Sequence, residues 1–136
     1  MAKDELQQGR IERLRAMVIG QALERLELEH PHFTPESIVA SICAYEEEGN
    51  IGGVLDKMPN SIDGQPYTTL VVVDGGDDKT ADIARSYPGV IVIEFPINLG
   101  HGVALQVTYR YCIEHHVQYV VTLDADGQND PGEMAT

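Results

Sequence analysis

The apolar run from residue 68 to residue 73 restricts the fold more than any other feature of this 136-residue chain. It reads Thr-Thr-Leu-Val-Val-Val, and its many β-branched side chains favour a strand over a helix. The run has no charged residue and no polar alternation, as is typical of a strand that is covered on both faces. It therefore predicts a buried strand in a parallel sheet that is flanked by helices.

Strand and helix patterns alternate from residue 38 to the end of the chain. Strands are predicted at 38–43, 68–73, 90–95 and 119–123, and helices at 50–58, 78–86 and 102–116. A further helix is expected to begin near Pro131. This order is typical of an α/β fold with a doubly wound, mainly parallel sheet and right-handed crossovers.

An amphipathic helix is predicted ahead of these elements, at residues 4–29. Apolar residues recur there at helical steps, at Ile11, Leu14, Val18, Ala22 and Leu26, and Pro31 and Pro35 end the pattern. The segment carries no group that indicates chemistry, and its expected role is packing or the pairing of chains into a homo-oligomer. The sequence thus divides into a helix with its linker at 1–35 and an α/β unit at 36–136.

The charge balance of the chain excludes one class of partner. The 22 acidic residues outnumber the 9 basic residues, which gives a formal net charge of −13. A nucleic-acid surface would require clustered Lys and Arg, so no nucleic-acid partner is expected. A phosphate ligand would instead need a bound cation, or free backbone N–H groups at the starts of helices.

Two further features bear on location. No apolar segment of the sequence reaches the roughly 18 residues that a membrane span requires. Cys43 and Cys112 each lie in an apolar segment, and their spacing fits no metal site. They are predicted to be buried free thiols, which is consistent with a reducing, cytoplasmic location.

The loops after the four predicted strands carry the candidate functional residues, because ligands of such sheets bind beyond the carboxyl ends of the strands. Ala44, Tyr45 and Glu47 follow the first strand, Asp74 the second, Gly100 the third, and Asp124 and Asp126 the fourth. Carboxylates gathered at one edge would repel one another unless a cation or a hydrogen-bonded ligand lay among them.

The loop after the fourth strand gives the sharpest indication. Asp124 and Asp126 are alternate residues of an extended segment and so point the same way, with Gln128 at the next step. Such oxygen ligands suit Mg²⁺ or Mn²⁺, which would bridge a diphosphate. The alternative is a solvated turn, since Asp, Gly and Asn are common turn residues. A Ca²⁺ loop is rejected, because Asn129 and Ala135 stand where an EF-hand needs Gly and Glu.

The other three loops give weaker indications of nucleotide binding. Tyr45 is suited to flank a nucleobase, and Glu47 and Asp74 are suited to accept hydrogen bonds from a base or a ribose hydroxyl. Free N–H groups near Gly100, where a helix begins, are suited to meet an anion. The alternatives are a solvated helix start after the first strand and a structural or surface role for His101.

In order and spacing, the four loops resemble motifs of the family 2 glycosyltransferases. The first loop, residues 44–51, resembles Pro-Ala-Tyr-Asn-Glu-Glu-x-Asn-Ile, and the second, residues 74–80, resembles Asp-Asp-Gly-Ser-x-Asp-x-Thr. The third, residues 98–104, resembles Asn-x-Gly-x-Gly-x-Ala. The fourth, residues 124–131, is most similar to Asp-Ala-Asp-x-Gln-x-x-Pro of the dolichyl-phosphate mannose synthase and polyprenyl-phosphate glycosyltransferase branch. Cys43, Glu46 and Val73 depart from the Pro, Asn and Asp that are usual in the motifs.

This resemblance implies the Rossmann-like nucleotide-binding half of a GT-A fold and the activity of a hexosyltransferase. It implies that Ala44, Tyr45, Glu47 and Asp74 hold the nucleoside of a nucleotide-diphosphate sugar, with Gly100 also in that site. It implies that Asp124, Asp126 and Gln128 hold Mg²⁺ or Mn²⁺ on the diphosphate, the two aspartates being the catalytic candidates.

The resemblance also implies a partner and a location. The implied acceptor is a polyprenyl phosphate, which would place the full-length enzyme at the inner face of the membrane. Because the acceptor-binding half of the family follows the Asp-x-Asp loop, the chain is expected to be an N-terminal fragment. The alternative is a non-catalytic module for nucleotide-sugar binding or oligomerisation. A sugar nucleotidyltransferase is disfavoured, because no Gly-rich loop with Arg and Lys follows the first strand.

Overall fold

The computed structural model describes residues 2–126 and 130–135 of the chain. Along the chain its elements are α1 (Ala2–Glu29), β1 (Ile38–Ala44), α2 (Ile51–Asp56), β2 (Thr68–Asp74), α3 (Thr80–Arg85), β3 (Val90–Phe95), α4 (His101–Glu114), β4 (Tyr119–Asp124) and the 3-10 helix η1 (Pro131–Ala135). The strands and helices predicted from the sequence are all present, and their ends lie within two residues of the predicted ends.

The four strands form one parallel sheet in the order β3-β2-β1-β4. In the register of the ladders, Ser41 of β1 lies opposite Leu70 of β2 on one side and Thr122 of β4 on the other. Successive strands add on one side of β1 until β3, and β4 then adds on the opposite side. The topological switch point therefore falls between β1 and β4, which is where ligands of doubly wound sheets bind.

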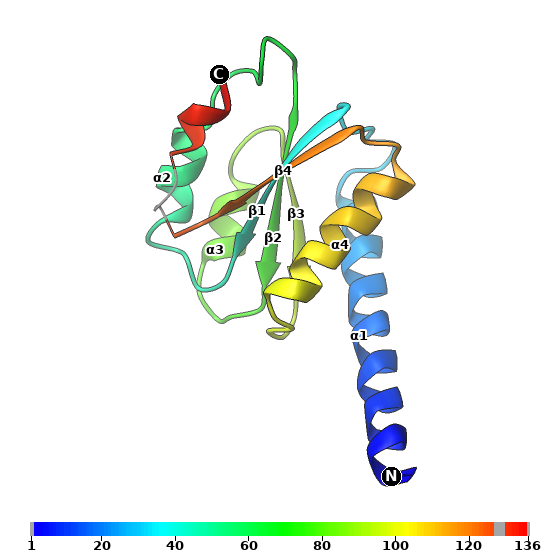
Figure 1. The fold of residues 1–136 in the computed structure, drawn as a ribbon. Coiled ribbons are helices and arrows are strands. Elements are labelled where there is room, and N and C mark those ends of the chain that lie inside the picture. The colour runs from blue at the N-terminus through cyan, green and yellow to red at the C-terminus, as the bar shows by residue number, and fades with distance from the viewer. Residues whose placement is uncertain (1, 127–129, 136) are drawn as a thin grey trace.

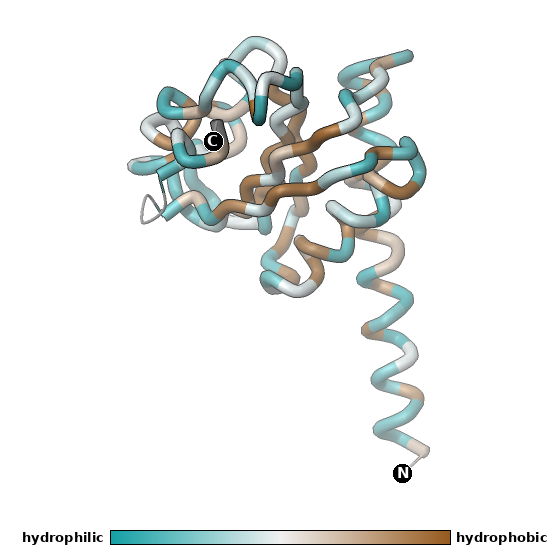
Figure 2. Tube along the Cα trace, turned by 45° about the horizontal axis from the view of Figure 1, so that its top comes forward, coloured by the Kyte–Doolittle hydropathy of each residue, from teal (hydrophilic) through white to brown (hydrophobic). Residues whose placement is uncertain are grey.

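Helices cover both faces of the sheet, as Figure 1 shows. Side chains alternate between the two faces of each strand, so Leu70 and Val72 pack on one side and Val71 and Val73 on the other. The first face packs against α1 and α4, and the second packs against α2 and α3. Figure 2 shows the hydrophobic strands running through the middle of the molecule. This arrangement confirms the predicted doubly wound α/β fold.

The strand β4 lies at one edge of the sheet and is less buried than β3 at the other edge, which is covered by α1 and α3. The three other strands are almost wholly buried, whereas Tyr119 at the start of β4 is 66% exposed. No helix within the described ranges is both long and apolar enough to cross a bilayer. Cys43 and Cys112 are buried free thiols, as predicted from their apolar surroundings.

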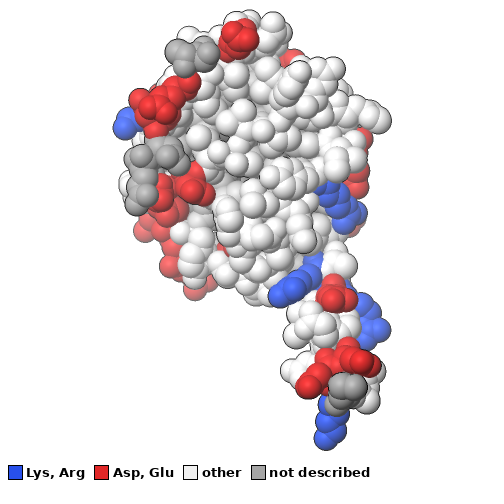
Figure 3. Space-filling view, viewed as in Figure 1, with Lys and Arg blue, Asp and Glu red and all other residues white. Residues whose placement is uncertain are grey.

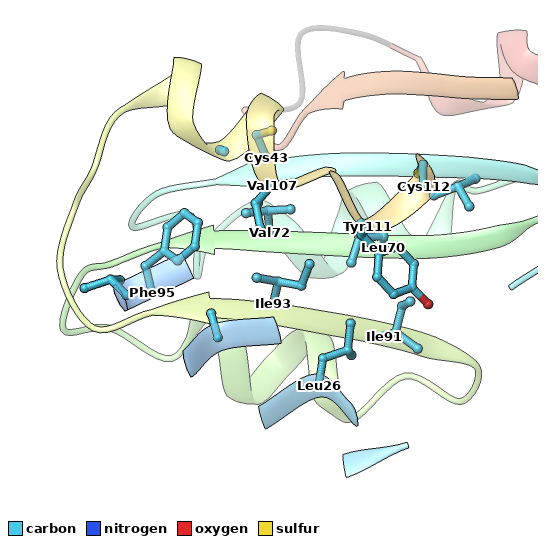
Figure 4. Packing of buried hydrophobic residues seen from close by; sticks show 14 residues of the cluster. Leu26, Cys43, Leu70, Val72, Ile91, Ile93, Phe95, Val107, Tyr111 and Cys112 are labelled. Carbon is cyan, nitrogen blue, oxygen red and sulfur yellow. The ribbon is translucent and has the colours of Figure 1, made fainter. Parts of the chain in front are cut away.

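The C-terminal half of α1 belongs to the core of the α/β unit. Its buried residues Val18, Ala22 and Leu26 pack with the side chains of β2, β3 and α4 that Figure 4 shows from close by. The rest of the helix extends away from this core, as Figure 1 shows. The division of the chain into 1–35 and 36–136 stays a prediction. The second half of α1 packs in the same core as β2, β3 and α4.

An ion-pair network fixes α1 to the sheet. The Arg85 guanidinium contacts Glu94 of β3 at 2.7 Å and Glu29 of α1 at 3.0 Å, and Arg25 of α1 contacts the same two carboxylates. Burial acts to lower the pKa of Arg85, but the hydrogen bonds and charges of Glu94 and Glu29 outweigh it and raise that pKa. Such a shared network defines position better than isolated surface pairs do.

Candidate functional site

The loops at the carboxyl ends of all four strands meet around one cavity of about 380 Å³. Its lining consists of Cys43, Ala44, Tyr45, Glu47, Asp74, Asn98, Gly100, His101, Ala104, Asp124, Ala125 and Asp126. Of the candidate residues named from the sequence, Ala44, Tyr45, Glu47, Asp74, Gly100, Asp124 and Asp126 all line this cavity. Gln128 lies outside the described residues. The structure thus brings together candidate residues that are up to about eighty positions apart in the sequence.

Hydrogen bonds hold the loop after β1 against the loop after β2. The backbone N–H of Glu47 donates to Thr80 Oγ1 at 2.9 Å, and the carboxylate of Glu47 accepts from Asn50 Nδ2 at 2.9 Å. Thr80 is fully buried, so this anchor is fixed by the core behind it. Tyr45, in contrast, is about half exposed, at 48%. Glu47 is therefore held in place by hydrogen bonds, whereas Tyr45 lines the cavity and is also open to solvent.

A reciprocal pair of hydrogen bonds joins the same two loops further out. The backbone N–H of Glu48 donates to Asp78 Oδ2 at 3.1 Å, and the backbone N–H of Lys79 donates to Glu48 Oε2 at 3.0 Å. Asp78 also accepts from the N–H and the hydroxyl of Thr80. Burial acts to raise the pKa of Asp78, but these hydrogen bonds outweigh it and lower that pKa below its ordinary value. Glu48 and Asp78 thus hold the two loops together through hydrogen bonds, and they also add negative charge to this region.

The carboxylate of Asp74 ties the loop after β3 to the end of β2. Its two oxygens accept from the backbone N–H of Leu99 at 2.7 Å, from that of Gly100 at 2.9 Å and from Asn98 Nδ2 at 3.3 Å. The residue is only 5% exposed. Since an ionised carboxylate has about four acceptor positions, these bonds leave room for about one more donor. The sequence predicted that Asp74 binds the nucleoside. The structure shows that its carboxylate also holds the loop after β3 beside the cavity.

The start of α4 forms one wall of the cavity. Gly100 precedes the helix with a backbone φ of 100°, in a region that favours glycine, and it lines the cavity together with His101. The N–H groups of Val103 and Ala104 donate to the carbonyl oxygen of Gly100, both at 3.2 Å. The N–H groups of His101 and Gly102, at the positive end of this 14-residue helix, are therefore the ones that could meet an anionic ligand.

The segment after β4 presents two carboxylates on either side of a buried residue. Ala125 is 2% exposed, and its backbone N–H donates to the carbonyl oxygen of Cys43 at 3.2 Å. Asp124 and Asp126 flank it, are both exposed, and both line the cavity. The described residues include no group of three or more His, Cys, Asp or Glu side chains placed to hold a metal ion. A cation here would therefore take two carboxylates from the described chain and complete its shell with other oxygens.

The thiol of Cys43 lies at the floor of the cavity and stays protonated. Burial raises its pKa to about 11, and the charges of Asp124 and Asp74 add to the effect. Among the described residues that line the cavity, none is Lys or Arg. Figure 3 shows the acidic side chains gathered mainly on the side of the molecule that carries α2, while most of the basic side chains lie on or beside α1. An anionic ligand in this cavity therefore needs a cation to offset the charge of the protein.

Sequence reasoning did not assign a binding role to several lining residues. Asn98 was noted only as part of a motif, and its amide turns out to fix Asp74. Ala104 and Ala125 are apolar residues with no chemical signature, and only the packing of α4 and β4 brings them to the cavity. Their places in the third and fourth motifs were the only signal that these residues offered.

The fold and the cavity define a doubly wound α/β protein with a ligand site at the switch point of its sheet. The family model described as "Glycosyl transferase family 2" matches residues 40–135. The chain therefore belongs to glycosyl transferase family 2, in agreement with the resemblance of its four loops.

The chain is similar to several glycosyltransferases and to the solved structure of one of them. A dolichyl-phosphate beta-glucosyltransferase of Trichomonas vaginalis is 31% identical over 108 residues, which cover 70% of this chain and 32% of the relative. A dolichyl-phosphate hexose transferase of Haloferax volcanii is 32% identical over 94 residues, covering 69% and 38%. The chain thus spans about a third of the length of these relatives. The mannosyltransferase PcManGT from Pyrobaculum calidifontis, solved with GDP-Man and Mn²⁺, superposes with a TM-score of 0.52 at 20% identity over 82% of this chain and 35% of that one. This likeness confirms the GT-A fold.

Proposed function

We propose that the chain is the nucleotide-sugar-binding part of a glycosyltransferase that moves a hexose from a nucleotide-diphosphate sugar to a polyprenyl phosphate with the help of a divalent metal. The observation that carries this proposal is that Asp124 and Asp126 line the same cavity as the loops after β1, β2 and β3. The names of two relatives, which are dolichyl-phosphate transferases, support the acceptor. The GDP-Man and Mn²⁺ of the mannosyltransferase support the donor and the metal.

The donor set of the cavity fits Mg²⁺ or Mn²⁺. Asp124 and Asp126 supply hard oxygen ligands. Asp124 ends β4, whereas Asp126 lies in the turn that follows and not in an extended segment as predicted, yet both residues line the cavity. Such an ion, when bound, would neutralise diphosphate charge and stabilise the charge that develops as the diphosphate leaves. Gln128 is proposed as a third ligand on the basis of its spacing in the sequence.

The protein's own groups supply binding and orientation. Tyr45 offers an exposed ring to the face of a nucleobase, and Glu47 offers a fixed acceptor to a base or ribose hydroxyl. The start of α4, which Asp74 holds in place through Gly100, lines the cavity and offers the N–H groups of His101 and Gly102 to an anionic ligand. The acceptor oxygen of a lipid phosphate is already anionic, so no strong general base is required to activate it. An acceptor of this kind would place the reaction at the inner, cytoplasmic face of the membrane.

A binding module without transfer activity is the second candidate. The observation that favours it is that the candidate residues gathered in the cavity are those proposed to hold the nucleotide sugar and its metal, and none of them is proposed to hold an acceptor. In this candidate function, the cavity binds the nucleotide sugar, and no acceptor is bound beside it.

The two candidates are separated by following the sugar. GDP-[¹⁴C]mannose and UDP-[¹⁴C]glucose are incubated with the chain, Mn²⁺ and a polyprenyl phosphate, and the products are separated by chromatography. Transfer that requires Mn²⁺ and is lost in Asp124→Asn supports the enzyme. Metal-dependent nucleotide binding without any sugar release supports the module, and neither binding nor release would reject both.

A further inference from the structure

The first residue of α4, His101, lies between two glycines in the wall of the cavity. No atom from elsewhere in the described part of the chain lies within 4 Å of the place where a Cβ would stand on Gly100 or on Gly102. Residues 100–102 therefore present a single side chain, the imidazole of His101, with open space on both sides of it. The helix start has room for a ligand at this point.

The backbone on either side of His101 is fixed. Before it, the N–H groups of Leu99 and Gly100 donate to the carboxylate of Asp74 at 2.7 Å and 2.9 Å. After it, the N–H group of Ala104 donates to the carbonyl oxygen of Gly100 at 3.2 Å, and Ala104 is fully buried. His101 is therefore held at a defined place in the cavity wall, although its own side chain is exposed.

The imidazole of His101 has none of the contacts that a structural role would require. It makes no hydrogen bond, ion pair or ring contact with the residues that the structure describes. His115, just beyond the other end of the same helix, is different. It lies 3.4 Å from the carboxylate of Glu27, and its ring packs on that of Tyr111 with the centroids 4.3 Å apart. His115 thus belongs to the packing of α4 against α1, whereas the imidazole of His101 is available to a ligand.

Among the described residues that line the cavity, His101 is also the one whose side chain can carry a positive charge. Carboxyl groups ordinarily titrate below pH 6 and phenols above pH 8, so an imidazole is the group that changes its charge between about pH 6 and pH 8. Burial raises the pKa of Cys43 to about 11, which keeps this thiol neutral over the same interval. Residues 96–100 and 102–108, on either side of His101, contain no titratable side chain. The titratable groups that share the cavity with His101 are Cys43, Tyr45, Glu47, Asp74, Asp124 and Asp126.

We propose that the imidazole of His101 contacts the diphosphate of the nucleotide sugar and makes its binding stronger as the pH falls. This inference rests on the proposed function, because it takes the cavity as the site of a nucleotide-diphosphate sugar. The protonated imidazole adds a charge-assisted hydrogen bond to those of the backbone N–H groups of His101 and Gly102. The anionic ligand binds the protonated imidazole more tightly than the neutral one. Binding therefore takes up protons, and it weakens as the pH rises through the range in which an imidazole loses its proton.

Isothermal titration calorimetry with GDP-mannose and UDP-glucose in the presence of Mg²⁺ tests the proposal at about pH 6, 7 and 8. A nucleotide sugar is the suitable probe, because both of its phosphates are diesters and keep their charge over this interval, whereas the terminal phosphate of a free nucleotide titrates near pH 6. We expect at least one of the two to bind about fivefold or more tightly at pH 6 than at pH 8. The number of protons taken up is measured from the change in binding heat between buffers of different ionisation enthalpy.

Two substitutions of His101 separate its charge from its presence. His101→Asn keeps a hydrogen-bond donor without the charge, and it is expected to bind equally at pH 6 and pH 8 with no proton uptake. His101→Lys keeps the charge throughout, and it is expected to bind at both pH values about as tightly as the natural chain does at pH 6.

His116→Asn is the matched control, because His116 is exposed and lies outside the cavity lining, and it should retain the pH dependence. Binding by the natural chain that does not change with pH, or a pH dependence that persists in His101→Asn, overturns this inference and leaves the proposed function standing. Absence of nucleotide-sugar binding in every variant and at every pH overturns both.

Discussion

Asp74→Ala removes the carboxylate that anchors the loop after β3, and the structure allows the size of the effect to be worked out. The substitution leaves the partly buried N–H groups of Leu99 and Gly100 without their acceptor and also removes a partner of Asn98. A hydrogen bond to a charged group contributes about 1.5–3 kcal/mol, and an orphaned buried donor costs about 1–3 kcal/mol. Entry of water into the open cavity recovers part of this cost, so we expect the free energy of unfolding to fall by about 3 kcal/mol.

The assay is urea denaturation followed by far-ultraviolet circular dichroism, with nucleotide binding measured on the same samples. Asn98→Ala is the matched control, because it removes only the amide that donates to Asp74 and should cost about 1 kcal/mol. Asp74→Ala should also weaken nucleotide binding, since the released loop carries Gly100 and the start of α4. An Asp74→Ala loss no larger than that of Asn98→Ala would refute the reasoning.

Three further predictions concern single positions. Gly75→Ala should destabilise the fold by about 3 kcal/mol or more in the same denaturation assay, because φ is 76° there and a Cβ would overlap the backbone of Ile97 and Asn98; near-neutral behaviour would contradict this. Thr108→Val should lower the free energy of unfolding by about 1–3 kcal/mol, because it leaves the buried Ser41 hydroxyl without its partner at 2.9 Å. A decrease below about 0.5 kcal/mol, the size typical of surface substitutions, would argue against this role. Burial raises the pKa of Cys112 to about 11 from an ordinary 9.0, so ionisation disfavours the folded state. Its contribution to stability is complete below pH 9 and is lost as the pH rises through 11, so the urea midpoint should fall over this interval by less in Cys112→Ala than in the natural chain.

The fold was predictable from the sequence because its strands carry a strong local signal. The run at β2 is apolar on both faces, and this predicted a covered parallel strand before any partner was known. Strand β4 shows the limit of such reasoning. Its apolar residues resemble those of a buried strand, but it lies at one edge of the sheet with Tyr119 exposed, whereas β3 at the other edge is covered by α1 and α3. This difference depends on strand order and helix packing and not on local pattern.

The candidate site was predictable in its location and less so in its detail. The rule that ligands bind at strand ends was enough to select Glu47, Asp74 and Asp124, and the cavity gathers all three. The rule did not predict that the Asp74 carboxylate accepts three hydrogen bonds from the loop after β3. The donors, in residues 98–100, lie about 25 positions away in the sequence. Contacts of this kind depend on tertiary packing, which no local pattern reports.

The central claim is that a divalent cation between Asp124 and Asp126 allows an acidic protein to hold an acidic nucleotide. Isothermal titration calorimetry with GDP, UDP and dTDP, each with and without Mn²⁺, tests it most directly in the natural chain, in Asp126→Ala and in the control Asp77→Ala, which changes an exposed aspartate outside the cavity lining. We predict that at least one nucleotide binds about tenfold or more tightly with Mn²⁺, that Asp126→Ala abolishes this gain, and that Asp77→Ala retains it. Binding in Mn²⁺ that is unchanged by Asp126→Ala would contradict the account.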